Sequence, residues 1–117
     1  MSSSQRQSVC MLADLDDPGA RGFRFGAGER LREGFVVRRG EQAWAWLNVC
    51  PHAGRPLNWK PDGFLTRDGS RIMCSAHGAT FEPDTGLCVA GPCPGRHLTQ
   101  IPCEIVAGEV IVDPEGL

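Results

Sequence analysis

Glycine and proline constrain this chain more than any other residue types. The 117 residues include 15 Gly and 9 Pro, and turn-forming groups recur in the second half, among them PDG at 61–63, DG at 68–69 and PDTG at 83–86. Both residue types weaken a helix interior and favour turns. The pattern therefore predicts short strands joined by many turns, with no long helix.

Apolar segments on either side of a turn predict where the longer strands lie. Residues 34–39 (GFVVRR) and 43–49 (AWAWLNV) flank a turn at residues 40–42, as in a β-hairpin. In the second arm Trp44 and Trp46 share one face, which indicates packing in a core. Residues 14–22, rich in Asp, Pro and Gly, are expected to form a loop. Shorter strands are predicted around residues 8–12, 23–25, 71–74, 80–81, 87–89, 97–101, 105–106 and 110–112.

These segments predict one all-β domain, an antiparallel β-sandwich or barrel with a loop-rich subdomain at about residues 50–95. An apolar fraction of 41% and a charged fraction of 22% are typical of a globular chain. Residues 1–7 are polar and are expected to be disordered, which places the domain at residues 8–117.

The charge and the apolar runs exclude several classes of partner. A net charge of −2 gives no electrostatic footprint for nucleic acid or an anionic membrane. No apolar run approaches the roughly 20 residues of a membrane span, and the first ten residues do not read as a secretory signal. We therefore expect a cytoplasmic protein, whose six cysteines would be reduced and would serve metal binding or simple burial.

Two short motifs carry candidate metal ligands. Cys50 and His52 lie in one predicted turn, and Cys74 and His77 lie in another. Two apposed turns of this kind would bring two thiolates and two imidazoles to one point. A tetrahedral zinc ion would accept that set, although structural zinc sites usually begin with two cysteines a few residues apart. A Rieske [2Fe–2S] centre needs two Cys on one iron and two His on the other, and unligated thiols are the third alternative.

The motifs closely resemble those of Rieske-type ferredoxins. CPHAGRPL at 50–57 and CSAHGATF at 74–81 are similar to the two cluster loops of that family, and TGLCVAGPC at 85–93 is similar to its trailing proline loop. The resemblance implies one [2Fe–2S] cluster per chain, held by Cys50, His52, Cys74 and His77. The spacer between the loops is longer than in the family, and the extra residues are expected to protrude as a hairpin around 61–70.

The resemblance also implies a reduction potential. With neutral imidazoles the oxidised cluster has no net charge, which places its potential between about −150 and +300 mV. High-potential relatives carry Ser and Tyr hydroxyls where this chain has Ala79 and Phe81, and a loop disulfide where it has Arg55 and Ala76. We expect a potential toward the bottom of the range, because hydroxyl donors to sulfur raise it.

Residues outside the ligand set receive separate predictions. Arg55, Pro56, Leu57 and Pro92 are expected to surround the exposed histidine edge and to form a docking rim. The other expectations are burial for Cys10 and Cys103, packing beside the cluster for Cys88 and Cys93, cover for the longer loop from Trp59 and Phe64, and a surface position for His97.

Three functions follow from these motifs. The first is a one-electron carrier, similar to ferredoxins that pass electrons from a flavin-dependent reductase to a terminal oxygenase. The second is an electron-input subunit similar to the small subunit of nitrite reductase, and the third is a zinc-stabilised binding module without redox activity. A self-sufficient oxygenase is excluded, because its second iron needs two further His and the chain has three in all.

Overall fold

The computed structural model describes residues 6–26, 28–51, 54, 56–58, 60–75, 78–91 and 95–114. This part of the chain contains strands and two short 3-10 turns, and it contains no α-helix, as the glycine and proline content predicts. The elements are β1 (Gln7–Met11), η1 (Leu12–Asp14), β2 (Gly19–Phe25), η2 (Gly28–Arg30), β3 (Arg32–Arg39), β4 (Gln42–Leu47), β5 (Ile72–Met73), β6 (Thr80–Phe81), β7 (Cys88–Ala90), β8 (Gln100–Ile101), β9 (Cys103–Val106) and β10 (Glu109–Val112). Within these ranges no helix is long and apolar enough to cross a membrane.

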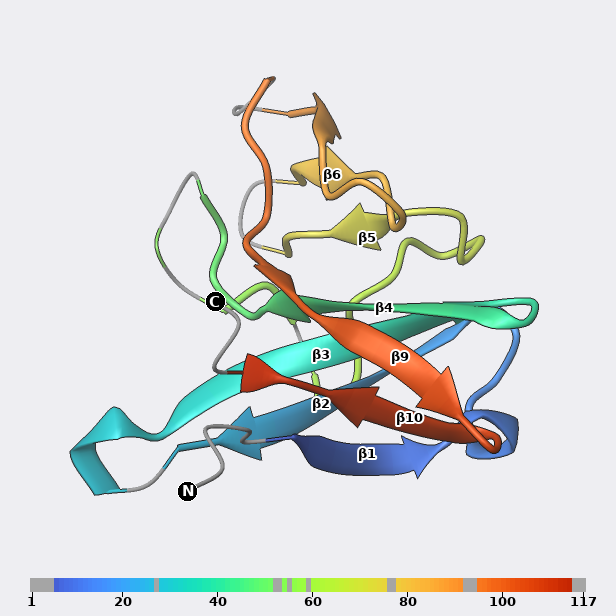
Figure 1. The fold of residues 1–117 in the computed structure, drawn as a ribbon. Helices are drawn as coiled ribbons and strands as arrows, with labels where there is room; N and C mark the ends of the chain where they lie inside the picture. The colour runs from blue at the N-terminus through green and yellow to red at the C-terminus, as the bar shows by residue number, and fades with distance from the viewer. Residues whose placement is uncertain are drawn as a thin grey trace.

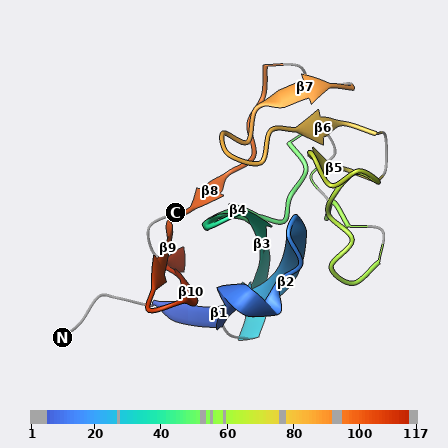
Figure 2. The same cartoon turned by 90° about the vertical axis from the view of Figure 1, so that its right-hand side faces the viewer.

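The strands form three antiparallel sheets (Figure 1). The first sheet has the order β1-β10-β9, the central sheet β2-β3-β4-β8 and the small sheet β5-β6-β7. The first and central sheets curve around a common interior, and the small sheet lies outside the central sheet (Figure 2). The all-β antiparallel fold predicted from the sequence, a sandwich or barrel, is confirmed.

The β3–β4 hairpin is buried on both faces, and its register explains why. Phe35 pairs with Trp46, and the neighbouring pair is Val36 with Ala45. Phe35 and Trp46 pack toward the small sheet together with the half-buried Trp44, while Val36 and Ala45 pack toward the first sheet. The predicted hairpin and the shared face of the two tryptophans are both confirmed.

Two apolar cores result. The sandwich core, between the first and central sheets, contains Leu12, Leu15, Phe25, Val36, Ala45, Leu47, Ile101, Val110 and Val112. The small-sheet core, on the other face of the central sheet, contains Phe35, Val37, Trp46, Cys50, Leu57, Phe64, Ile72, Cys74, Ala79, Phe81, Cys88 and Leu98.

Two predicted boundaries in the first 25 residues are wrong. Gln7, expected to be disordered, begins β1, and its side-chain Nε2 donates to the Arg24 carbonyl across the gap between β1 and β2 (2.8 Å). β2 begins at Gly19, inside the predicted loop, because its first residues pair with the second half of β3. That pairing is a long-range contact, and the local Gly-rich composition does not reveal it.

The segment after the first motif forms a hairpin, as predicted, and the base of the hairpin is anchored in the small-sheet core. Leu65 bridges Ile72, and the Met73 amide donates to the Phe64 carbonyl (2.8 Å). Phe64 stacks on Phe35 with ring centroids 4.3 Å apart, and is 2% exposed. Stacking of Phe64 in the small-sheet core therefore folds the segment back onto the central sheet.

One aromatic side chain joins the small sheet to the central sheet. The Trp46 indole Nε1 donates to the Pro83 carbonyl (3.1 Å). Gly86, with φ of +73°, lies so close to the same ring that a Cβ there would be 2.6 Å from it. The PDTG turn at residues 83–86 therefore packs directly against Trp46 of β4.

Candidate metal centre

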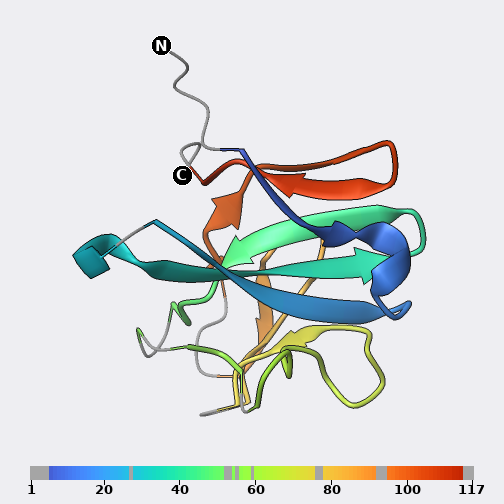
Figure 3. The same ribbon diagram turned by 90° about the horizontal axis from the view of Figure 1, so that it is seen from below.

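Cys50 lies in the loop after β4, and Cys74 directly follows β5. That loop and the small sheet lie on the same side of the central sheet (Figure 3). Both cysteine side chains are fully buried and belong to the small-sheet core. No disulfide joins any two of the five described cysteines. Two buried thiols in one apolar core provide the sulfur half of the predicted ligand set.

The two cysteines begin turns of the same construction. The Cys50 carbonyl accepts from the Gly54 amide (2.7 Å), and the Cys74 carbonyl accepts from the Gly78 amide (2.9 Å). Gly54 and Gly78 have φ of +68° and +73°, a backbone region that glycine adopts without strain. The two cysteines therefore accept the same backbone bond, from a left-handed glycine four residues later, and the role of Gly54 was not anticipated from the sequence.

Leu57 ties the two turns together. Its carbonyl accepts from the Ser75 amide (3.0 Å), and its own amide donates to the Asn48 side-chain Oδ1 (2.8 Å). Leu57, which follows the first cysteine loop, is thereby hydrogen-bonded to Ser75, the residue after Cys74. This backbone bond links the two cysteine loops directly.

The described part of the third motif, TGLCVAG at residues 85–91, packs next to the second cysteine loop. Gly91, with φ of +94°, lies against Ala79, so that a Cβ on Gly91 would be 2.6 Å from the Ala79 Cα. The end of the VAG segment is therefore packed on the residue that follows the second turn. The first, second and third motifs converge at one end of the small-sheet core.

Family comparison decides what these three segments are. Residues 5–105 match the family described as Rieske [2Fe-2S] domain. The chain belongs to the Rieske [2Fe–2S] family.

Individual relatives agree with this Rieske assignment. The chain is 34% identical over 109 residues to ferredoxin CarAc of Metapseudomonas resinovorans, covering 92% of each protein. It is similar to a chain in the complex of reduced oxygenase and oxidized ferredoxin of carbazole 1,9a-dioxygenase, with 27% identity, a TM-score of 0.74 and coverage of 96% and 95%. The carbazole 1,9a-dioxygenase ferredoxin of Nocardioides aromaticivorans IC177 gives 25% identity, a TM-score of 0.71 and coverage of 95% and 99%. This protein is a Rieske ferredoxin, an electron carrier.

The donor set fits a Rieske cluster as far as it is described. Cys50 and Cys74 supply two thiols, and among the described residues no group of three or more His, Cys, Asp or Glu side chains offers a different metal site. The predicted imidazole ligands, His52 and His77, lie outside the described residues. So do Arg55, Trp59, Ala76, Pro92 and Cys93.

The predicted docking rim needs one correction. Leu57 is 0% exposed and packs in the small-sheet core beside both cysteines. Its backbone bonds to Asn48 and Ser75 hold it there, so the side chain cannot contact a partner. Pro56, the preceding residue, is exposed, and it is the described part of the rim that a partner can reach.

Ala79 and Phe81 line the site core without hydroxyl groups. Both are fully buried in the same core as Cys50 and Cys74. The surroundings of the thiols are therefore apolar at the two positions where the sequence comparison looked for hydroxyl donors.

The remaining described cysteines have structural surroundings. Cys88 is buried and its thiol donates to the Ala90 carbonyl (3.3 Å). Cys10 and Cys103 are half-buried rather than buried, and both pack against the sandwich core. Burial raises the pKa of both thiols, that of Cys103 to about 11. His97 is exposed, as predicted.

Proposed function

We propose that this ferredoxin carries single electrons in the cytoplasm, from a flavin-dependent reductase to a Rieske-type terminal oxygenase. The cluster is held by the Cys50 and Cys74 thiolates and the His52 and His77 imidazoles. The observation that carries the proposal is the pair of equivalent turns, each beginning at a fully buried cysteine and linked through Leu57. When bound, a [2Fe–2S] cluster takes up and releases one electron without making or breaking a substrate bond.

The two cysteine loops each have a buried part and an exposed part, and both parts serve electron transfer. Cys50 and Cys74 are fully buried, whereas Gly54, Pro56 and Gly78 in the same two loops are exposed. The thiolates are thereby kept from water, and the loop tips are left open to a partner. A carrier needs both properties, because the cluster must be protected between encounters and approached closely during them.

We place the reduction potential toward the bottom of the range of about −150 to +300 mV that holds for Rieske centres. Support comes from Ala79 and Phe81, which are buried beside the cysteines and have no hydroxyl to donate to a sulfur. A low potential suits a donor that must pass its electron onward to an oxygenase.

The free-standing carrier is favoured over a subunit of a larger reductase. The chain covers 92% of ferredoxin CarAc, and the ferredoxin in the oxygenase complex is matched over 95% of its length. The family match leaves the zinc-stabilised module without support.

Stopped-flow mixing tests the proposed partner. The ferredoxin is reduced anaerobically and mixed with an oxidised Rieske-type oxygenase, and reoxidation by one electron per chain is expected. Pro56→Asp should slow this step and leave the spectrum unchanged, because it places a charge on the exposed loop. Val106→Asp, at another exposed apolar position, on the first sheet, is the matched control and should not slow it.

The opposite outcomes would contradict the proposal. A ferredoxin that purifies in a stable complex with a larger reductase and does not exchange electrons with an oxygenase would be a subunit. Equal rates for Pro56→Asp and the unmodified protein would place the docking surface elsewhere.

A further inference from the structure

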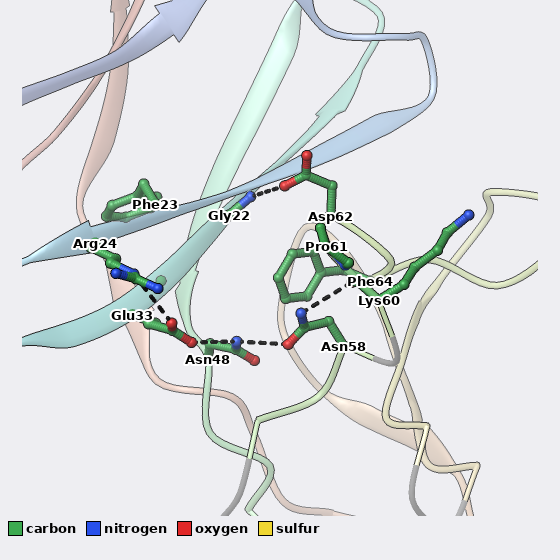
Figure 4. Close-up of a pocket in the computed structure, with 11 residues that line it drawn as sticks. Gly22, Phe23, Arg24, Glu33, Asn48, Asn58, Lys60, Pro61, Asp62 and Phe64 are labelled. Atoms are coloured by element: carbon green, nitrogen blue, oxygen red, sulfur yellow. Dashed lines mark hydrogen bonds and ion pairs between the residues drawn. The ribbon is translucent and has the colours of Figure 1, made fainter.

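Asn48 is a buried amide at the entrance to the first cysteine loop. It lies between the end of β4 and Cys50 and is 4% exposed. Its Oδ1 accepts from the Leu57 amide (2.8 Å), and its Nδ2 donates to Asn58 Oδ1 (3.0 Å). Figure 4 shows Asn48 between Glu33 of β3 and Asn58, with the ion pair of Glu33 and Arg24 beyond it.

The Asn48 side chain is important because it holds Leu57, the residue that links the two cysteine loops. The Asn48–Leu57 bond closes the chain segment that contains Cys50, and the Leu57 carbonyl accepts from Ser75, next to Cys74. A single side chain therefore fixes the residue to which both cysteine loops are attached. Asn48 itself is held on the central sheet, since its backbone N–H donates to the Glu33 backbone carbonyl (3.0 Å).

We propose that Asn48 is a positioning residue that sets the placement of the Cys50 and Cys74 thiols relative to each other, acting through Leu57. This inference rests on the proposed function, since the thiols matter as ligands. Without the Asn48 carbonyl oxygen, the buried Leu57 amide would lack an acceptor, and a buried unsatisfied donor is costly. Leu57 would then shift, and the Ser75 link would carry the shift to the second loop.

The test compares Asn48→Ala with a matched variant in the same pocket. Asp62 also uses a side-chain oxygen to accept a backbone amide, that of Gly22 (2.7 Å), but this bond does not involve the cysteine loops. Asp62 has φ of +62°, so Asp62→Gly removes the bond and keeps the backbone conformation. Each variant is examined as the cluster-containing protein, by low-temperature EPR and by amide hydrogen exchange.

The expected result separates the two variants. In Asn48→Ala the EPR g values shift or broaden, and the Ser75 amide exchanges about fivefold faster or more, as the cost of an unsatisfied buried amide implies. In Asp62→Gly both readouts stay at the values of the unmodified protein. Unchanged readouts in Asn48→Ala, or equal changes in both variants, would overturn the inference.

A conservative variant keeps the test decisive if Asn48→Ala does not fold. Asn48→Asp retains an oxygen acceptor for the Leu57 amide, which should stay protected. It replaces the Nδ2 donor to Asn58 by a second carboxylate near Glu33, so the overall stability falls while the Leu57 bond is kept. Rapid exchange of the Leu57 amide in the unmodified protein, or loss of its protection in Asn48→Asp, would overturn the inference. Absence of a Rieske signal from the unmodified protein would defeat the proposed function itself.

Discussion

Leu57 is a core residue, although its place in the first motif predicted an exposed side chain in the docking rim. The side chain is fully buried in the small-sheet core, and it cannot serve as part of a docking rim. We predict that Leu57→Ala lowers the free energy of unfolding by about 2–5 kcal/mol, the usual cost of a buried Leu-to-Ala change. Urea denaturation measures this, and Pro56→Ala, at the exposed neighbour, is the control. A loss as small as that of the control would contradict the buried position.

Cys103 gives a pH dependence at the residue scale. Burial, aided by Cys10 and Glu104, raises the pKa of this thiol from its ordinary value of 9.0 to about 11. The folded protein therefore holds the proton more tightly than the unfolded chain, and the stability that this provides is lost as pH rises from 9 to 11. Urea midpoints at pH 8 and pH 11 should show a smaller decrease in Cys103→Val. Equal decreases in both proteins would contradict the assignment.

The turn between β6 and β7 tests how the small sheet is attached. Gly86→Ala places a Cβ within 2.6 Å of the Trp46 ring at a φ of +73°. We predict a loss of about 2 kcal/mol or more, since a left-handed backbone costs about 1–2 kcal/mol and overpacking about 1–3 kcal/mol.

Gly40→Ala is the matched control for the backbone part of this cost. Gly40 has φ of +63° in the β3–β4 turn, and a Cβ there would meet no atom within 4 Å. It should lose only the backbone contribution in urea denaturation. Equal losses for the two variants would show that the Trp46 contact is not tight.

The low predicted reduction potential rests on Ala79, just before β6, and on Phe81 within it, because neither side chain has a hydroxyl group. Ala79→Ser combined with Phe81→Tyr should raise the reduction potential, because hydroxyl donors to a cluster sulfur stabilise the reduced state. Redox titration followed by circular dichroism measures the shift. Ala43→Ser, on the opposite face of the central sheet, should leave the potential unchanged. No upward shift in the double variant would mean that neither hydroxyl reaches a sulfur.

At the scale of elements, sequence patterns predicted the strands that combine an apolar segment with a clear turn. The β3–β4 hairpin could be predicted because both faces are apolar and the turn residues are typical. The start of β2 could not, because Gly19 to Gly22 are a strand only through pairing with β3. Phe64 was expected to cover a loop, and only the fold shows that it stacks on Phe35.

At the scale of the whole molecule, the site was predictable where chemistry is local and unpredictable where contacts are long-range. The spacing of cysteine and histidine within each motif predicts the ligand set, Cys50 with His52 and Cys74 with His77, and a sequence displays such spacing directly. The bonds from Asn48 to Leu57 and from Leu57 to Ser75 join residues that are separate in the chain. No local pattern marks an asparagine as the residue that holds a loop closed.

Low-temperature EPR of the dithionite-reduced protein, purified anaerobically and analysed for iron and zinc, tests the central claim most directly. We predict two irons per chain and a rhombic signal with an average g below the free-electron value. Cys50→Ser should lose this signal, and Cys88→Ser, which alters an equally buried thiol outside the ligand set, should keep it. One zinc per chain without an EPR signal, or a normal signal from Cys50→Ser, would contradict the account.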